Sequence, residues 1–326
     1  KRYKLPLSDP AAVAGMPETA LALASEKARR EGYTDGWIFD LSAPSYFAFM
    51  KHCPDGNLRR QMYEAKMCVG FVDNEYNNEA LIRRMVNGRL EEAQLLGYDT
   101  FAHFALHDRM AKNPKAVQEL LDKLLDAYKP KATDELEMIR KWAADKTSEV
   151  DNFTIQPWDW AYFSEQYKQA HYDLDDEMMR PYFELGRVTR GIFGLANRLY
   201  GLHFSERTDV PVYHPDVKVY EVSDEDGSYI GLLYTDFFPR EGKQNGAWMN
   251  NLRDQSEHQH PHIIIVMNFT PPSADKPSLL TAGEVETFLH EFGHALHGML
   301  SKCRFSSLSG TSVARDFVEL PSQIME

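Results

Sequence analysis

The sequence has no long hydrophobic run. Its longest strongly apolar segment, Ile263 to Met267, is far shorter than the roughly 18 residues that a membrane span needs, and no charged-then-apolar signal segment opens the chain. We therefore expect no membrane partner. The expected location is the cytoplasm, or the periplasm if a signal that was later removed preceded residue 1.

Cysteine is scarce, and basic charge falls short of acidic charge. Cys53, Cys68 and Cys303 are scattered, without the spacing of a disulfide framework or a thiolate zinc site, which favours reduced thiols. Lys and Arg number 36 against 49 Asp and Glu, giving a net charge of −13. Because so acidic a surface repels phosphate backbones and no basic patch offsets it, we expect no nucleic-acid partner.

The composition is that of a folded globular protein, with 43% hydrophobic and 26% charged residues among 326. This length allows one large domain or two ordinary ones. We assign residues 1–155 to a helical part and residues 156–326 to a catalytic part with a small sheet, and we expect a monomer. The chain starts without Met and stops inside an apolar-patterned stretch, which suggests a segment of a longer protein, cut at both ends.

Helical patterns dominate the first 200 residues. Residues 17–30 predict a helix that Gly32 ends, and residues 36–41 predict a strand or a buried connection. Further helices are expected from Leu58 to Ala144 and from Tyr182 to Tyr200. The breaks between them are expected near Asp73, Gly97, Pro114 and Pro130.

The pattern changes after Gly201. Residues 217–222 alternate with period two, residues 224–227 supply a turn, and residues 229–237 return as a second strand, which predicts a β-hairpin. A third strand is expected at residues 263–269. The expected fold class is therefore mainly α, with many helices and a small β-sheet.

A metal-binding motif follows the third strand. Thr281 and Glu284 have the spacing of a capping box that opens a helix, and this helix carries His290-Glu291-Phe292-Gly293-His294, an H-E-x-x-H motif. At about 100° per residue, His290, His294 and His297 share one face, and the large apolar residues occupy the opposite one. An accidental match would not be expected to separate the faces in this way.

Two imidazoles one turn apart can bind a single tetrahedral Zn²⁺, and Glu291 lies beside the metal, where it can act as a base on bound water. We expect one zinc ion per chain. His297 lies one turn beyond the pair, so its simultaneous coordination would be strained, and we assign it to the surroundings of the ligands or to the surface.

A catalytic zinc site needs a third protein ligand. The metzincin arrangement is excluded, because Leu300 stands where its third histidine would be. A carboxylate from Asp316, Glu319 or Glu326 is the alternative, and Glu319 is the central candidate because Asp316, Glu319 and Gln323 share a helical face. Asp316 would instead orient a ligand imidazole or serve as a helix N-cap.

These motifs resemble the M3 family of zinc metallopeptidases, the group of thimet oligopeptidase and oligopeptidase A, and most of all its peptidyl-dipeptidase Dcp branch. The resemblance rests on LHEFGHALHG at 289–298, LSGT at 308–311, DFVELPSQ at 316–323, PVYHPDV at 211–217 and GAWM at 246–249.

The resemblance implies zinc ligands His290, His294 and Glu319, with Glu291 as general base, in a mostly helical zincin-type fold beside a deep channel. It also implies that residues holding the substrate lie in a part of the family's proteins beyond Glu326. The implied activity is the hydrolysis of short peptides with release of C-terminal dipeptides. The alternatives are an oligopeptidase that cuts internally and a non-catalytic helical interaction protein.

An extended peptide substrate would add as a strand to residues 229–237 and to Gly246-Ala247. Gly246 and Ala247 are accordingly candidate substrate-binding residues.

Overall fold

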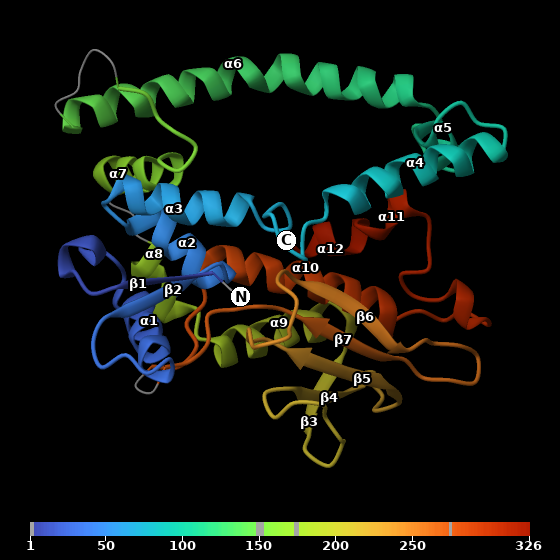
Figure 1. Cartoon of the computed structure of the whole chain (residues 1–326). Coiled ribbons are helices and arrows are strands. Elements are labelled where there is room, and N and C mark those ends of the chain that lie inside the picture. The colour runs from blue at the N-terminus through green and yellow to red at the C-terminus, as the bar shows by residue number, and fades with distance from the viewer. Residues whose placement is uncertain (1–2, 148–152, 173–175, 274–275) are drawn as a thin grey trace. The chain divides into compact units, whose positions relative to one another are not determined.

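The computed structural model describes residues 3–147, 153–172, 176–273 and 276–326 (Figure 1). The chain forms two compact units. One comprises residues 1–17, 24–41 and 45–173, and the other residues 18–23, 42–44 and 174–326. No helix in the described residues is long and apolar enough to cross a membrane. The domain boundary at 155 stays a prediction.

The first unit is built almost wholly from helices. The elements of the first unit are β1 (Lys4–Leu7), η1 (Pro10–Val13), α1 (Glu18–Arg30), β2 (Trp37–Asp40), α2 (Ala43–His52), α3 (Gly56–Met67), α4 (Glu79–Leu95), α5 (Phe101–Leu106), α6 (Pro114–Thr147) and α7 (Trp160–Tyr172). Helices α1 and α2 each begin in residues of the second unit. Strands β1 and β2 pair antiparallel. The segment that the sequence left as strand or connection is therefore a strand, and the expected first helix is confirmed as α1.

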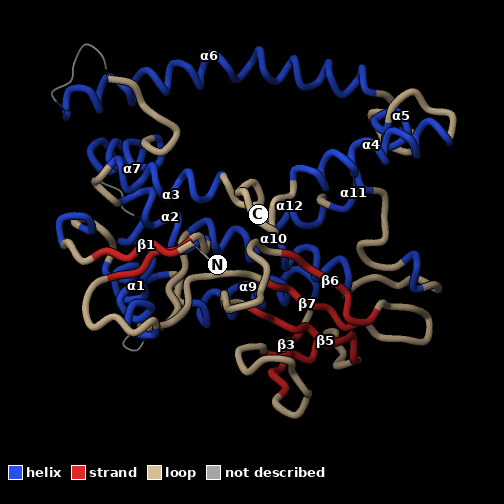
Figure 2. The backbone as a smooth tube through the Cα atoms, in the orientation of Figure 1, coloured by secondary structure: helices blue, strands red, loops and turns tan. Residues whose placement is uncertain are grey.

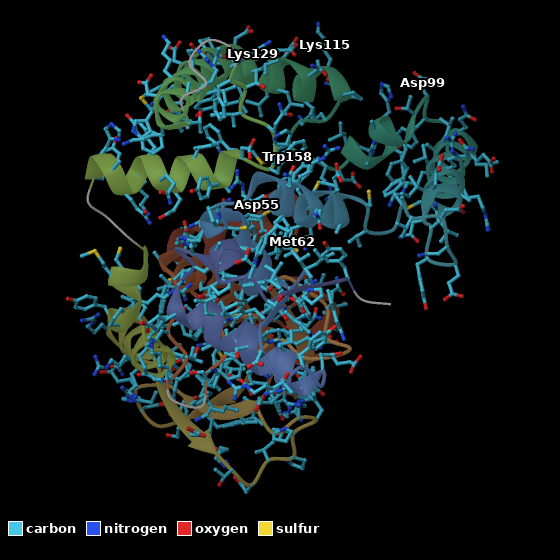
Figure 3. The ribbon with its side chains drawn as sticks, turned by 60° about the vertical axis from the view of Figure 1, so that its left-hand side comes forward. Asp55, Met62, Asp99, Lys115, Lys129 and Trp158 are labelled. Carbon is cyan, nitrogen blue, oxygen red and sulfur yellow. The ribbon has the colours of Figure 1, made fainter. Side chains whose placement is uncertain are left out.

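One expected helix break is wrong. Helix α6 runs without interruption through Pro130, although proline removes a backbone donor from a helix. The carbonyl of Asp126 loses that donor, but this stretch of α6 is exposed, so water can replace the missing partner. Figure 3 labels Lys129 on this stretch. The breaks expected near Asp73 and Gly97 are confirmed.

The second unit combines a five-stranded sheet with helices. Its elements are α8 (Asp176–Met179), η2 (Arg180–Tyr182), α9 (Leu185–Tyr200), β3 (His203–Arg207), β4 (Lys218–Ser223), β5 (Tyr229–Asp236), β6 (Trp248–Arg253), β7 (His262–Val266), α10 (Ala282–Met299), η3 (Ser306–Leu308), α11 (Arg315–Val318) and α12 (Leu320–Met325). The expected hairpin is β4–β5, and the expected third strand is β7. A mainly α fold with a small sheet is confirmed.

The sheet has the order β3-β4-β5-β7-β6, in which β5 and β7 are parallel and the other neighbours antiparallel (Figure 2). Because β5 lies between β4 and β7, both its edges are paired. A peptide cannot add to β5 as a strand, so that expectation is wrong. The free edge nearest the histidine helix belongs to β6, which directly follows Gly246-Ala247 and pairs only with β7 among the described strands.

Helices α9 and α10 pack on one face of this sheet. Their core includes Ile192 from α9, Leu233 and Ile265 from the strands, and Phe288 and Phe292 from α10, all buried. The opposite face buries a smaller cluster. Helix α10 is thus fixed on the sheet through the side of the helix that the sequence pattern marks as apolar.

A buried carboxylate anchors the connection between β5 and β6. Asp236, whose side chain is 1% exposed, accepts hydrogen bonds from Arg240 at 2.7 and 2.8 Å, from Lys243 Nζ at 2.9 Å and from Tyr213 Oη at 2.5 Å. Burial opposes ionisation, but these donors outweigh it and lower the pKa of Asp236 to about 2. Lys243 also donates to the carbonyl of Phe238, which ties the loop to the strand.

Replacing this carboxylate should destabilise the second unit. Asp236→Asn leaves the buried Lys243 ammonium and the partly exposed Arg240 guanidinium without their countercharge, and removing one partner of a buried pair costs about 3 kcal/mol or more. Since the folded pKa of about 2 lies below the unfolded value of about 3.9, the wild-type contribution is present above pH 4 and is lost as pH falls towards 2.

Urea unfolding between pH 2 and 7 tests this expectation. The wild-type free energy of unfolding should fall more steeply below pH 4 than that of the variant. Asp35→Asn, a change at an exposed carboxylate, is the matched control. It should leave the free energy of unfolding and its dependence on pH as they are in the wild type. Equal stability of Asp236→Asn and wild type at pH 7 would contradict the anchoring role.

Candidate metal centre

Helix α10 begins with the expected capping box. Glu284 N donates to Thr281 Oγ1 at 3.1 Å, and Thr281 N donates to Glu284 Oε2 at 2.8 Å. The Glu284 carboxylate also accepts from Thr270 N at 2.7 Å, so the cap ties the helix start to the segment that follows β7. The start of the helix, and with it the phase of the histidines, is therefore fixed by local chemistry.

His290, His294 and Glu319 lie together. One ligand atom from each falls within 4.8 Å of the others. Glu319 Oε2 lies 3.0 Å from His294 Nε2 and 3.4 Å from His290 Nε2. Two donors bound tetrahedrally to one zinc ion at about 2.1 Å are separated by roughly 3.4 Å. Two imidazole nitrogens and a carboxylate oxygen at this spacing fit a zinc ion.

Glu319 stands between two short helices, α11 and α12. The expectation that Asp316, Glu319 and Gln323 share one face of a single helix is therefore wrong, because the helix is interrupted at Glu319. The N-cap of α11 is Ala314, and Asp316 lies exposed inside the first turn, so the expected N-cap role of Asp316 is wrong as well. Burial opposes ionisation of Glu319, but the Ser322 hydroxyl and both imidazoles outweigh it and lower the pKa of this carboxyl.

Glu291 is buried at the same site. The residue is 6% exposed, and its Oε2 atom has no hydrogen-bond partner among the described residues. Burial, opposed by His290 and reinforced by Glu319, raises the pKa of Glu291 to about 7. A carboxylate with an unused oxygen beside the two imidazoles can take up a proton from a bound water.

The contacts of the three histidines show which of their nitrogen atoms face the cluster. His290 Nδ1 contacts the Glu326 carboxylate, which leaves Nε2 on the side of Glu319. Burial lowers the pKa of His294, favouring the neutral form that binds metals. His297 lies outside the cluster, with its ring 6.1 Å from that of Phe317.

Two residues of the site were not singled out by sequence reasoning. A Cβ atom on Gly293 would lie 2.5 Å from the Pro321 carbonyl oxygen and 2.6 Å from Ser322 Cα, so α12 can approach α10 only because residue 293 is glycine. Ser322 is fully buried and its hydroxyl lies 2.9 Å from Glu319 Oε2. A glycine inside a helix, where it costs about 1 kcal/mol relative to alanine, is the signal that could have identified the first.

Gly246 and Ala247 lead into the edge strand β6. Gly246 has φ +102°, which favours glycine, and its carbonyl accepts from Asn268 Nδ2 at 2.7 Å. Strand β6 packs on α10 about one turn beyond His294, since a Cβ on Gly298 would lie 2.8 Å from Met249 Cε. The free edge of the sheet and the histidines are therefore presented by adjoining elements.

Two histidines on one helix and a carboxylate from a later segment form a group that can hold a metal ion, with a buried acid beside it. The sequence profile of Peptidase family M3 matches residues 49–326, and the chain belongs to this family of metallopeptidases. The resemblance noted from the motifs is thereby confirmed.

Curated relatives agree with the profile. The chain is 40% identical to dipeptidyl carboxypeptidase of Escherichia coli over 325 residues, covering 99% of this chain and 47% of that protein. It is 39% identical to oligopeptidase A of Salmonella typhimurium over 330 residues, covering 98% and 48% respectively. It is 36% identical to organellar oligopeptidase A of Arabidopsis thaliana, covering 100% and 43%. The chain thus spans about half the length of these relatives.

The metal content of the purified chain tests the ligand set. We expect about one zinc per chain by mass spectrometry, and loss of the metal in Glu319→Ala, because two imidazoles alone form an incomplete site. Glu286→Ala removes an exposed carboxylate from α10 and is the control that should keep its zinc. A wild-type chain without zinc, or a Glu319→Ala variant that retains it fully, would rule out this ligand set.

Proposed function

We propose that the protein is a zinc-dependent, zincin-type peptidase that hydrolyses short peptides with Glu291 as general base. The observation that carries the proposal is the convergence of His290, His294 and Glu319 beside Glu291, a buried residue whose Oε2 atom has no hydrogen-bond partner among the described residues. Zinc, when bound there, would supply a Lewis acid for the scissile carbonyl and a lowered pKa for the attacking water. His290, His294 and Glu319 would hold it.

The chain's own residues provide the proton transfers. Glu291 takes a proton from the water while the water oxygen attacks the peptide carbon. Glu291 then returns that proton to the leaving amine. The water oxygen ends in the new carboxyl group, and the peptide C–N bond breaks without a covalent bond to the protein. His290 keeps its orientation through the contact of Nδ1 with Glu326.

Of the two candidate reactions, we favour the release of C-terminal dipeptides over internal cleavage. The names of the relatives support both, since one is a dipeptidyl carboxypeptidase and another an oligopeptidase A at almost equal identity. Monomeric state, cytoplasmic location and the lack of a nucleic-acid partner stay predictions from the sequence.

We place the peptide substrate on strand β6. The outer edge of β6 carries backbone N–H and C=O groups that pair with no described strand, and an extended peptide can form hydrogen bonds to such an edge. Gly246 and Ala247, at the start of this edge, would pair with the substrate backbone first. The packing of Met249 against Gly298 places this edge next to the helix that carries Glu291.

Glu291→Gln should separate metal binding from hydrolysis. The amide cannot accept the proton of the water, so cleavage should fall by about 10²-fold or more, while zinc content stays at the wild-type level. The assay follows fragments of an unlabelled peptide by mass spectrometry. Undiminished cleavage by the variant would exclude Glu291 as the base, and a non-catalytic interaction protein would show no cleavage dependent on this residue.

The products of the same assay distinguish the two reaction types. A peptidyl-dipeptidase should shorten a peptide with a free C-terminus by two residues at a time and spare one with an amidated C-terminus. An internally cutting oligopeptidase should cleave both peptides at the same bond.

Pairing with β6 should depend on the substrate backbone. Methylating one peptide nitrogen at a time removes one donor without changing the side chains, and at paired positions binding should weaken by about 3- to 10-fold, the worth of one hydrogen bond. The binding of each methylated peptide is measured by how strongly it inhibits cleavage of the parent peptide. Peptides methylated at the alternate, unpaired positions are internal controls, because strand pairing uses every second residue. Equal inhibition by every methylated peptide would exclude strand addition.

A further inference from the structure

Helices α10 and α12 approach each other backbone to backbone at Gly293. At Gly293 the absent Cβ would lie 2.5 Å from Pro321 O, 2.6 Å from Ser322 Cα and 3.0 Å from Pro321 C. All three are backbone atoms, which cannot turn aside as the end of a flexible side chain can. Any side chain at residue 293 must therefore displace α12 from α10.

The displaced segment is the one that holds Glu319. Glu319 immediately precedes α12, and Ser322, the residue whose Cα lies over Gly293, directs its hydroxyl back at Glu319. That hydroxyl lies 2.9 Å from the Glu319 carbonyl oxygen and 2.9 Å from Glu319 Oε2. The same Oε2 atom lies 3.0 Å from His294 Nε2, and His294 directly follows Gly293.

We propose that Gly293 and Ser322 are positioning residues for the metal centre. Gly293 sets the separation of the two helices, and Ser322 fixes the Glu319 carboxylate against the imidazoles within that separation. This proposal rests on the proposed zinc site and adds to it the means by which a ligand on a separate, short element reaches the histidine helix.

The hydroxyl of Ser322 suits this role chemically. It is fully buried, so water does not compete for it, and it is neutral, so it restrains an oxygen of Glu319 without cancelling the negative charge that attracts a cation. A carboxylate oxygen has lone pairs for both a hydrogen bond and a metal. Partners of metal ligands at this distance typically change metal affinity 10- to 100-fold when removed.

Zinc affinity, measured by competition with a chromogenic chelator, tests the proposal independently of hydrolysis. Ser322→Ala removes one oxygen and no packing atom beyond it, and we expect a 10- to 100-fold weaker zinc affinity. Gly293→Ala should weaken it at least as much. Gly283→Ala is the matched control, because it lies in the same helix and its Cβ would have no neighbour within 4 Å. It should bind zinc as the wild type does.

Thermal unfolding of the metal-free chains separates positioning from general damage. Ser322→Ala should unfold near the wild-type temperature without metal and gain less stabilisation from added zinc. If Gly293→Ala fails to fold, Ser322→Ala decides the question. Wild-type zinc affinity in both variants would overturn the positioning role alone, whereas a wild-type chain that binds no zinc would overturn the ligand set of the proposed function and this inference with it.

Discussion

The packing of α10 on the sheet is the constraint on which the site depends. Phe288 and Phe292 bury the apolar side of the helix among strands and α9, so the side that carries His290 and His294 must face the other way. The capping box fixes where the helix begins, and a shift of one residue would rotate the histidines by about 100°. Only with this helix fixed on both counts can a carboxylate from another segment meet both imidazoles.

Two buried carboxylates of the second unit differ in how burial and charge are balanced around them. Asp236 is buried among two cations and stays ionised, whereas Glu291 is buried with an unused oxygen and its pKa rises. Both carboxylates lose hydration, and the difference lies in the donors around them. The first is suited to holding a loop, the second to exchanging a proton.

Local sequence patterns predicted what local interactions determine. The capping box, the histidine face of α10 and the β4–β5 hairpin depend on residues close together in the chain. The expected break at Pro130 was wrong because an exposed helix can satisfy a lost backbone bond with water. The pairing of β5 on both edges and the contact of Gly293 with α12 arise between segments distant in sequence, and periodicity carries no information about them.

The parallel pairing of β5 and β7 gives the intervening β6 an unusual position. The chain leaves β5, returns along the outside of β7 as β6, and only then forms β7. Trp248 packs on one face of the sheet and Met249 on the other, so a slip of one residue would exchange the two faces. The register of β6 on β7 thus decides which of its backbone groups point outward, and the loop held by Asp236 is the segment that leads into this strand.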